Sequence, residues 1–171
     1  MILVAFLLEK STHMHSTAIQ ANDLVGRKTA RDGGTGAKSI AAQIARTEAE
    51  LLASPNADAQ AMGKRLKAAR EAFVEVVDFI AANGKSNPNA AYSGSVPYLL
   101  LTGNLVAGWQ MGRALLVALT PEAQAQDAAF MAAKVTTARF YGDHILSKVP
   151  GMRDSIVEGA DSVTGLALEA F

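Results

Sequence analysis

The chain has 171 residues, 50% of them hydrophobic and 19% charged, which is enough for one ordinary domain with a buried core. Lysine and arginine together number 16, as do aspartate and glutamate. The chain therefore lacks the excess of basic residues that would indicate a nucleic acid partner. The absence of cysteine excludes disulfides, a thiolate nucleophile and a cysteine zinc site, and it fits a reducing compartment. We therefore expect a single cytoplasmic domain that does not bind nucleic acid.

Two apolar stretches resemble export or membrane signals. Residues 1–10, "MILVAFLLEK", lack a preceding positive region and a small-residue cleavage site, and they are too short to cross a bilayer. Residues 86–112 carry no charge, but asparagine, serine and glutamine residues interrupt them. A spanning helix needs about 20 predominantly apolar residues. The second stretch is therefore predicted to be a buried helix, and we expect no membrane span.

Two helices are predicted in the first third of the chain. One begins at Ser16 or Thr17, whose hydroxyl groups suit an N-cap, and ends at the turn of residues 31–34. Its apolar side is predicted to carry Ile19, Leu24 and Val25. The other covers residues 37–53, before the Ser-Pro-Asn breaker. Its predicted inner face consists of Ile40, Ile44, Thr47 and Leu51.

The clearest helical pattern lies between residues 60 and 82. Apolar residues follow one another there at alternating steps of four and three, as on the buried face of a helix. They are Met62, Leu66, Ala69, Phe73, Val76 and Ile80. Asn83 and Gly84 are predicted to end this helix.

Residues 84–95 are predicted to form a loop that leads into an apolar helix over residues 97–119, with Pro97 in its first turn. Small residues along this helix favour the close approach of another helix. They are Gly103, Ala107, Gly108 and Gly112.

The last third of the chain begins with Thr120 and Pro121, a cap and a first-turn proline, and one continuous helix is predicted from 122 to 148. Its inward residues are predicted to be Met131, Val135, Ala138, Gly142, Ile145 and Val149. Residues 152–171 are predicted to form one or two short helices whose inward residues are Ile156, Val163 and Leu166. Because no segment alternates with period two, the expected fold is all-α, an antiparallel bundle of about five to six helices.

A phosphate-binding loop is one interpretation of "RDGGTGAKS", residues 31–39. Such a loop needs a glycine-rich turn after a strand and a Gly-Lys pair that opens the next helix. Here alanine precedes Lys38, the spacing from the first glycine is wrong, and no buried strand comes before it. A turn between two helices is the favoured interpretation.

Several phrases of the sequence occur in an order that is typical of one enzyme family. The first is "TAIQANDLVGRK", residues 17–28, which resembles the segment after the catalytic glutamate in acyl-CoA dehydrogenases. Residues 98–109, "YLLLTGNLVAGW", and residues 133–146, "AKVTTARFYGDHIL", resemble an extra C-terminal helical domain. That domain occurs in the branch that includes 3-methylmercaptopropionyl-CoA dehydrogenases, which often ends in a Gly-Ala-X-Ser-Val phrase and a phenylalanine. Residues 159–163 and Phe171 match that ending.

The resemblance implies a parent enzyme that uses FAD to dehydrogenate an acyl-CoA between its α and β carbons. Its Glu-Gly-Thr motif aligns with Met14-His15-Ser16, so Met14 occupies the position of the catalytic glutamate. A thioether is not basic enough to accept the α-proton near neutral pH. We therefore expect no catalytic residue and no cofactor-binding residue in this chain, and no activity of the chain alone.

Residues 1–16 do not match the family and are interpreted as a tag or as the product of a shifted or truncated frame, so residues 17–171 form the expected bundle. His13 and His15 with Glu9 nearby are possible metal ligands, but an incidental pair is favoured and no metal site is expected. His144 follows Asp143 directly, and helical neighbours point about 100° apart, so a surface or capping role is favoured over a catalytic dyad.

Other conspicuous side chains are given structural roles. The four aromatic residues of the two last long helices are predicted to be core rather than stacking platforms for a ring: Trp109, Phe130, Phe140 and Tyr141. Lys134 and Arg139 are predicted to be solvated or paired with acidic groups, with contact to an acyl-CoA phosphate of the parent as the alternative.

Two functional hypotheses follow. The first is a C-terminal helical fragment of an acyl-CoA dehydrogenase that acts in assembly and in closing the cofactor region. The second is a self-standing helical interaction module without enzyme activity. In both, the apolar helix over residues 97–119 favours a symmetric homodimer, with Gly108 and Gly112 either at its interface or facing the internal core.

Overall fold

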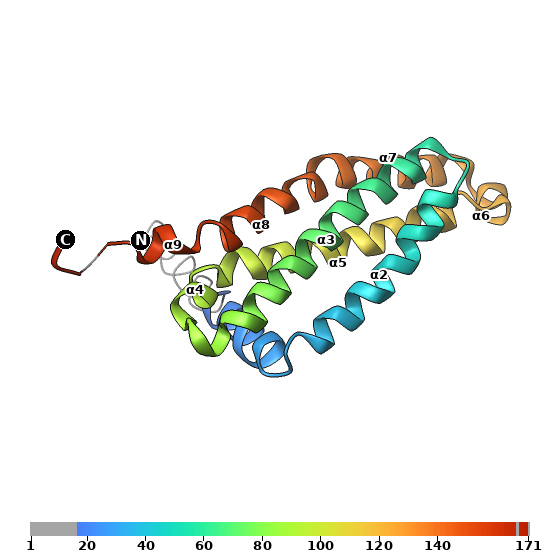
Figure 1. Ribbon diagram of the computed structural model, residues 1–171. Coiled ribbons are helices and arrows are strands. Elements are labelled where there is room, and N and C mark those ends of the chain that lie inside the picture. The colour runs from blue at the N-terminus through green and yellow to red at the C-terminus, as the bar shows by residue number, and fades with distance from the viewer. Residues whose placement is uncertain (1–16, 167, 171) are drawn as a thin grey trace, which may run out of the picture.

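The computed structural model describes residues 17–166 and 168–170, and this part of the chain is helical, with no strand (Figure 1). Residues 17–23 are α-helical and continue into the π-helix η1 (Leu24–Ala30). The α-helices that follow are α2 (Thr35–Ala53), α3 (Ala57–Ser86), α4 (Pro88–Ser93), α5 (Ser95–Ala118), α6 (Pro121–Gln126), α7 (Ala128–His144), α8 (Val149–Val157) and α9 (Ala160–Thr164). The short 3-10 helices are η2 (Leu146–Lys148) and η3 (Leu168–Ala170). The predicted all-α fold is confirmed.

The long helices form an antiparallel bundle. In Figure 1, α2, α3 and α5 run side by side in alternating directions, and α7 followed by α8 forms a fourth column. Helices α3 and α5 contact each other and also both outer columns, so they are the centre of the bundle. Among the described helices, none has the length and apolar character that a bilayer crossing requires.

The central helix α3 follows its predicted face. All six residues named for that face are buried, with exposed fractions of 3% or less. Asn56 begins the helix because its side-chain oxygen accepts hydrogen bonds from the backbone N–H groups of Asp58 and Ala59, at 2.9 and 3.1 Å. Burial of this apolar face against α2 and α5 is the main source of the bundle's stability.

The first segment differs from its prediction in two respects. After residue 23 the backbone widens into a π-helix, in which the N–H of Arg31 bonds to the carbonyl of Gly26 at 3.1 Å. Val25 is buried as predicted, but Ile19 is 66% exposed, whereas Ala21 in the same segment is fully buried. In α2, Ile44, Thr47 and Leu51 face inward, whereas Ile40 is 41% exposed, so its predicted place on the inner face is wrong.

The predicted continuous helix over residues 122–148 is also wrong, because the chain breaks at Asp127. This residue is extended, with φ −159° and ψ 89°, and its side chain accepts a hydrogen bond from the N–H of Phe130 at 2.9 Å. Asp127 therefore ends α6 and caps α7. The Thr120 cap is confirmed, since its hydroxyl oxygen accepts a bond from the N–H of Ala123. Of the predicted inward residues, Ala138, Gly142 and Val149 are buried and the others are half-buried.

The segments around the α5 N-terminus contain two further differences. The predicted loop over residues 84–95 contains α4, whose first helical residue is Pro88. In the C-terminal segment, Ile156 is buried against Gly94, as predicted. Among the described elements, the main contacts of α9 are with α4 and α8. Val163 of α9 and Leu166, which follows it, are 68% and 66% exposed. Their predicted inward orientation is wrong.

Two glycines of α5 face the internal core. A Cβ at Gly108 would lie 2.6 Å from Leu146 Cδ2, and a Cβ at Gly112 would lie 2.9 Å from Leu51 Cδ1. Both leucines are fully buried or nearly so. These glycines therefore let α2 and the segment after α7 approach α5 closely, which removes them from any interface with a second copy.

Candidate interaction face

The outer side of α5 is the main unpartnered apolar surface of the bundle among the described residues. Seven residues at alternating steps of four and three follow one line along this helix: Val96, Leu100, Gly103, Ala107, Gln110, Ala114 and Val117. We call this line the α5 face. Six of the seven are exposed and Ala107 is half-buried. Helix α3 covers the opposite side of α5, so the α5 face remains open.

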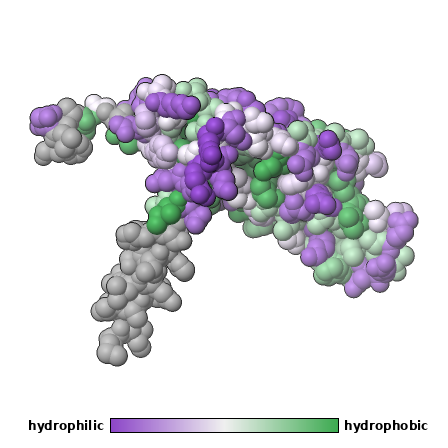
Figure 2. All heavy atoms as spheres, turned by 90° about the horizontal axis from the view of Figure 1, so that it is seen from below, coloured by the Kyte–Doolittle hydropathy of each residue, from purple (hydrophilic) through white to green (hydrophobic). Residues whose placement is uncertain are grey.

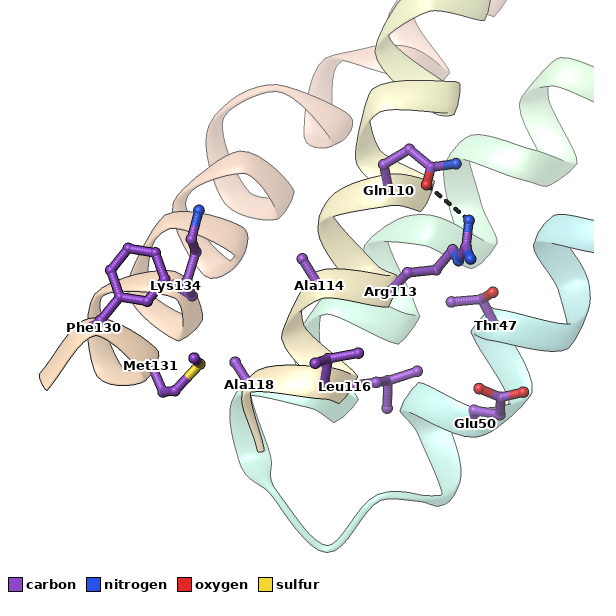
Figure 3. A pocket seen from close by; sticks show the side chains of 11 residues that line it. Thr47, Glu50, Gln110, Arg113, Ala114, Leu116, Ala118, Phe130, Met131 and Lys134 are labelled. Carbon is purple, nitrogen blue, oxygen red and sulfur yellow. Dashed lines mark hydrogen bonds between the residues drawn. The ribbon is translucent and has the colours of Figure 1, made fainter. Parts of the chain in front are cut away.

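A first hollow lies at the C-terminal end of the α5 face and has a volume of about 660 Å³. We call it the α7 hollow. Figure 3 shows α5 in the middle with Ala114 and Leu116, α7 on one side with Phe130 and Lys134, and α2 on the other side with Glu50. Its lining combines apolar side chains with the charged residues Glu50, Arg113 and Lys134.

A second hollow lies at the N-terminal end of the same face and has a volume of about 410 Å³. We call it the α8 hollow. Its walls are Val96 and Leu100 of α5 and Met152 of α8, and Lys148 is the charged residue among those that line it. Apolar side chains also interrupt the polar surface on the side of the bundle shown in Figure 2.

The charges along the two hollows are poorly neutralised. Arg113 donates a hydrogen bond to Gln110 at 3.0 Å and lies over the Trp109 ring, 5.7 Å from its centroid. Lys134 lies 5.0 Å from the centroid of the Phe130 ring. Within the described residues, Glu50 and Lys148 form no ion pair. An exposed apolar strip with charged groups at its edges has the character of an interaction surface.

Met14, which the sequence analysis places at the position of the catalytic glutamate, and Glu9, His13 and His15, which it considers an incidental cluster rather than a metal site, lie outside the described residues. Within the part of the chain that is described, no group of three histidine, cysteine or acidic side chains could hold a metal ion. Lys38, from the segment compared above with a phosphate-binding loop, forms an ion pair with Asp78 of α3, at 2.6 Å. The preceding Gly33 and Gly34 have φ values of 65° and 81°, as a tight turn between helices requires.

Asp143 and His144 do not form a dyad. Asp143 accepts a hydrogen bond from Arg139 at 2.7 Å, and this bond holds the pKa of its carboxyl below the usual range. Arg139 also binds Asp58 of α3 at 3.0 Å, so its predicted pairing with acidic groups is confirmed. The exposed His144 ring lies at the end of α7, 4.4 Å from the ring of Phe140.

The aromatic residues are divided between core and surface. Trp109 and Tyr141 pack against the core, and the Trp109 indole donates a hydrogen bond to the Thr47 hydroxyl at 2.8 Å. Phe130 and Phe140 are 52% and 59% exposed, so their predicted core position is wrong. Phe130 lines the α7 hollow beside α5, and Phe140 lies against the exposed His144 ring. Helical periodicity alone did not distinguish these positions from the buried face of α7.

The sequence analysis did not predict one buried polar contact. The Thr29 hydroxyl on η1 and the Tyr98 hydroxyl on α5 lie 3.0 Å apart, although 69 residues separate them in the chain. No spacing rule relates residues so distant. In the described part of the chain, every buried side-chain nitrogen or oxygen has a hydrogen-bond partner, so its core is fully satisfied by internal contacts.

Comparisons with known proteins agree on one family. A sequence model of the family described as acetyl-CoA dehydrogenase C-terminal like matches residues 37–167. The chain is 44% identical, over 153 residues, to the 3-methylmercaptopropionyl-CoA dehydrogenase of Ruegeria pomeroyi, an alignment that covers 90% of the chain and 26% of that protein. It is 29% identical, over 167 residues, to the broad-specificity linear acyl-CoA dehydrogenase FadE5 of Mycobacterium tuberculosis, with 89% and 26% covered.

The chain thus spans about a quarter of the length of these curated relatives, at 26% of each. No solved structure matches it. The family match covers more than half of the described bundle, from the start of α2 to beyond α9. The chain therefore belongs to the acyl-CoA dehydrogenase family, and it corresponds to the C-terminal helical domain of its members.

Proposed function

We propose that the chain acts as the C-terminal helical domain of a flavin-dependent acyl-CoA dehydrogenase, in assembly and in closing the cofactor region. The observation that carries this proposal is the family match over residues 37–167, together with 44% identity to a dehydrogenase over 90% of the chain. In the parent reaction the flavin would accept a hydride from the β carbon of an acyl-CoA while a glutamate removes the α-proton.

The chain alone is proposed to be inactive. Met14 aligns with the family's catalytic glutamate, and a thioether cannot act as a general base near neutral pH. The described helices supply a packed scaffold with ion pairs between columns, such as Arg139 of α7 with Asp58 of α3. Such a scaffold can position other protein segments without contributing a reacting group.

A complementation experiment tests the assembly role. The Ruegeria pomeroyi relative would be produced without the C-terminal quarter that this chain matches, and then mixed or co-expressed with the chain. We expect a stable complex and a gain of flavin content and acyl-CoA oxidation over the truncated relative alone. An unrelated helical bundle of similar size is the control. Equal results with the chain and with the control would contradict the proposal.

The proposed inactivity is tested on the purified chain. We expect no flavin absorbance and no acyl-CoA oxidation with an artificial electron acceptor, both for the chain and for Met14→Glu. Turnover by Met14→Glu alone would show that this segment contains more of an active site than we propose.

The second candidate is a self-standing helical interaction module. It is favoured by the continuous core that the described helices bury among themselves, from Val25 of η1 to Ile156 of α8. The genomic sequence immediately upstream separates the two candidates. An in-frame flavin domain supports the dehydrogenase domain, whereas a genuine isolated start codon supports the module. For either candidate we propose a cytoplasmic homodimer, and cell fractionation tests the location.

A further inference from the structure

Most of the large hydrophobic side chains that are exposed in the described part of the chain belong to one end of the bundle. Six of the ten are found there, with exposed fractions between 38% and 68%: Ile19, Tyr92, Val96, Leu100, Val163 and Leu166. They belong to residues 17–23, to α4, to the first turns of α5, and to α9 with the residues just after it. We call this region the entry end, because the described part of the chain begins there.

The elements of the entry end contact one another. Gly26 of η1 lies against the Tyr92 hydroxyl group of α4, and α9 packs against α4. The π-helix η1 also contacts α5, where the hydroxyl groups of Thr29 and Tyr98 lie 3.0 Å apart. In Figure 1 the blue start of the described chain, α4 and α9 lie at the same end of the bundle, and α6 lies at the opposite end. The exposed hydrophobic side chains are therefore concentrated in one region rather than scattered over the surface.

The entry end carries few charges where it meets α5. Residues 86–112, which include α4 and the first turns of α5, contain no charged residue. Lys148 is the charged residue among those that line the adjacent α8 hollow. The α7 hollow, toward the opposite end, is lined by three charged residues, Glu50, Arg113 and Lys134. Of these two regions, the entry end therefore has more of the character of a contact that is buried in an assembled protein.

We propose that the entry end docks on the part of an acyl-CoA dehydrogenase that precedes this domain, an inference that rests on the proposed function. The chain matches 26% of each curated relative and belongs to a domain described as C-terminal, so about three quarters of such an enzyme lie before it. That part would be joined to the bundle through residues 17–23, at the entry end. A tethered partner has a high effective concentration close to its point of attachment. Continuity of the chain thus favours the preceding part of the enzyme as the occupant.

Docking at this end would also serve the proposed role in closing the cofactor region. The position that aligns with the catalytic glutamate, residue 14, lies five residues before Ile19 in the sequence. Burial of Ile19 against the preceding part of the enzyme would hold the segment that leads from the glutamate into the bundle. The entry end would thus position the catalytic base of a parent enzyme without contributing a reacting group.

Thiol labelling of a chimera tests the contact. The Ruegeria pomeroyi relative would carry residues 17–171 of this chain in place of its own C-terminal quarter, so that the preceding part is present in the same polypeptide. This chain contains no cysteine, so single cysteines can be placed at Ile19, Leu100 and Val117 and followed by mass spectrometry of the labelled peptides. These three side chains are 66%, 54% and 61% exposed. Val117→Cys is the matched control, because it lies near the other end of α5.

The contact should protect two of the three thiols. In the isolated chain we expect Ile19→Cys, Leu100→Cys and Val117→Cys to be labelled at rates within about threefold of one another, because all three positions are open to solvent. In the chimera, labelling of Ile19→Cys and Leu100→Cys should be at least about tenfold slower than in the isolated chain, and that of Val117→Cys should change by less than about threefold.

The flavin content and the acyl-CoA oxidation of the unsubstituted chimera separate two kinds of failure. A chimera without flavin and without activity would contradict the dehydrogenase role, and the docking with it. An active chimera in which Ile19→Cys or Leu100→Cys is labelled as fast as Val117→Cys would leave that role standing and overturn the docking. Protection of Ile19→Cys or Leu100→Cys already in the isolated chain would overturn it as well, since a second copy or another part of the chain would then cover the entry end.

Discussion

The hydroxyl of Tyr98 on α5 and the hydroxyl of Thr29 on the π-helix η1 lie 3.0 Å apart in the core, and both residues are at most 1% exposed. The Tyr98 ring also stacks on Phe73 of α3, with the ring centroids 6.1 Å apart. One side chain thus joins the N-terminal segment to both central helices. Its contacts anchor the widened turn of η1, which has few other polar links to the bundle.

Replacement of Tyr98 by phenylalanine is expected to destabilise the bundle by about 1–2 kcal/mol, because the buried Thr29 hydroxyl loses its partner. Urea unfolding followed by circular dichroism measures this change. Thr29→Val removes the other hydroxyl, and the double variant should lose less than the sum of the two single variants. Strictly additive losses would show that the two hydroxyls do not interact.

Stability is expected to fall at alkaline pH. Burial raises the pKa of the Tyr98 hydroxyl above its usual value, and the bond with Thr29 acts in the opposite direction. The unfolded chain therefore releases this proton first, near pH 10, and the folded state loses stability as pH rises further. Urea unfolding between pH 8 and about 11.5 should show this slope in the unmodified chain. Tyr98→Phe should reduce the slope without removing it, since burial also raises the pKa of Tyr141.

Two ion pairs of α3 should differ strongly in their contribution. Arg70 donates to the carboxylate of Glu48 at 2.7 Å, and the two side chains are 19% and 10% exposed. Arg70→Met leaves that carboxylate nearly buried without its partner, at an expected cost of about 2–4 kcal/mol.

Lys67→Met is the matched control, because Lys67 pairs with Glu71 where both side chains are about half exposed, at 46% and 49%. We expect a change within about 0.5 kcal/mol. Chemical denaturation of both variants checks the difference. Equal losses would mean that burial of the Arg70 pair has been misjudged.

Two glycines of the same helix should respond in opposite ways to alanine. A Cβ at Gly103 has no neighbouring atom within 4 Å, so Gly103→Ala is expected to stabilise α5 by about 0.5–1 kcal/mol. At Gly108 a Cβ would collide with the buried Leu146 side chain. Gly108→Ala should therefore be at least about 1 kcal/mol less stable than Gly103→Ala in thermal unfolding. Equal gains would indicate that Leu146 does not rest against α5.

The helices with one apolar face could be predicted from sequence alone. In α3 the alternating steps from Met62 to Ile80 identified the buried face, because polar residues cover the rest of its circumference. Local hydrogen bonding also sufficed for the Thr120 cap. The family could be inferred as well, since several of its phrases occur in order. The break at Asp127 was missed because no proline or glycine marks it.

Only the tertiary structure decided how α5 is oriented. This helix is apolar around most of its circumference, so periodicity could not distinguish the side of Gly108, which meets Leu146, from the side of Leu100, which is open. The same limit applies to Phe130 and Phe140, whose burial depends on whether another helix lies beside them. The sequence determined the helices and the family through local patterns, and packing between distant segments decided which apolar faces remained available for a partner.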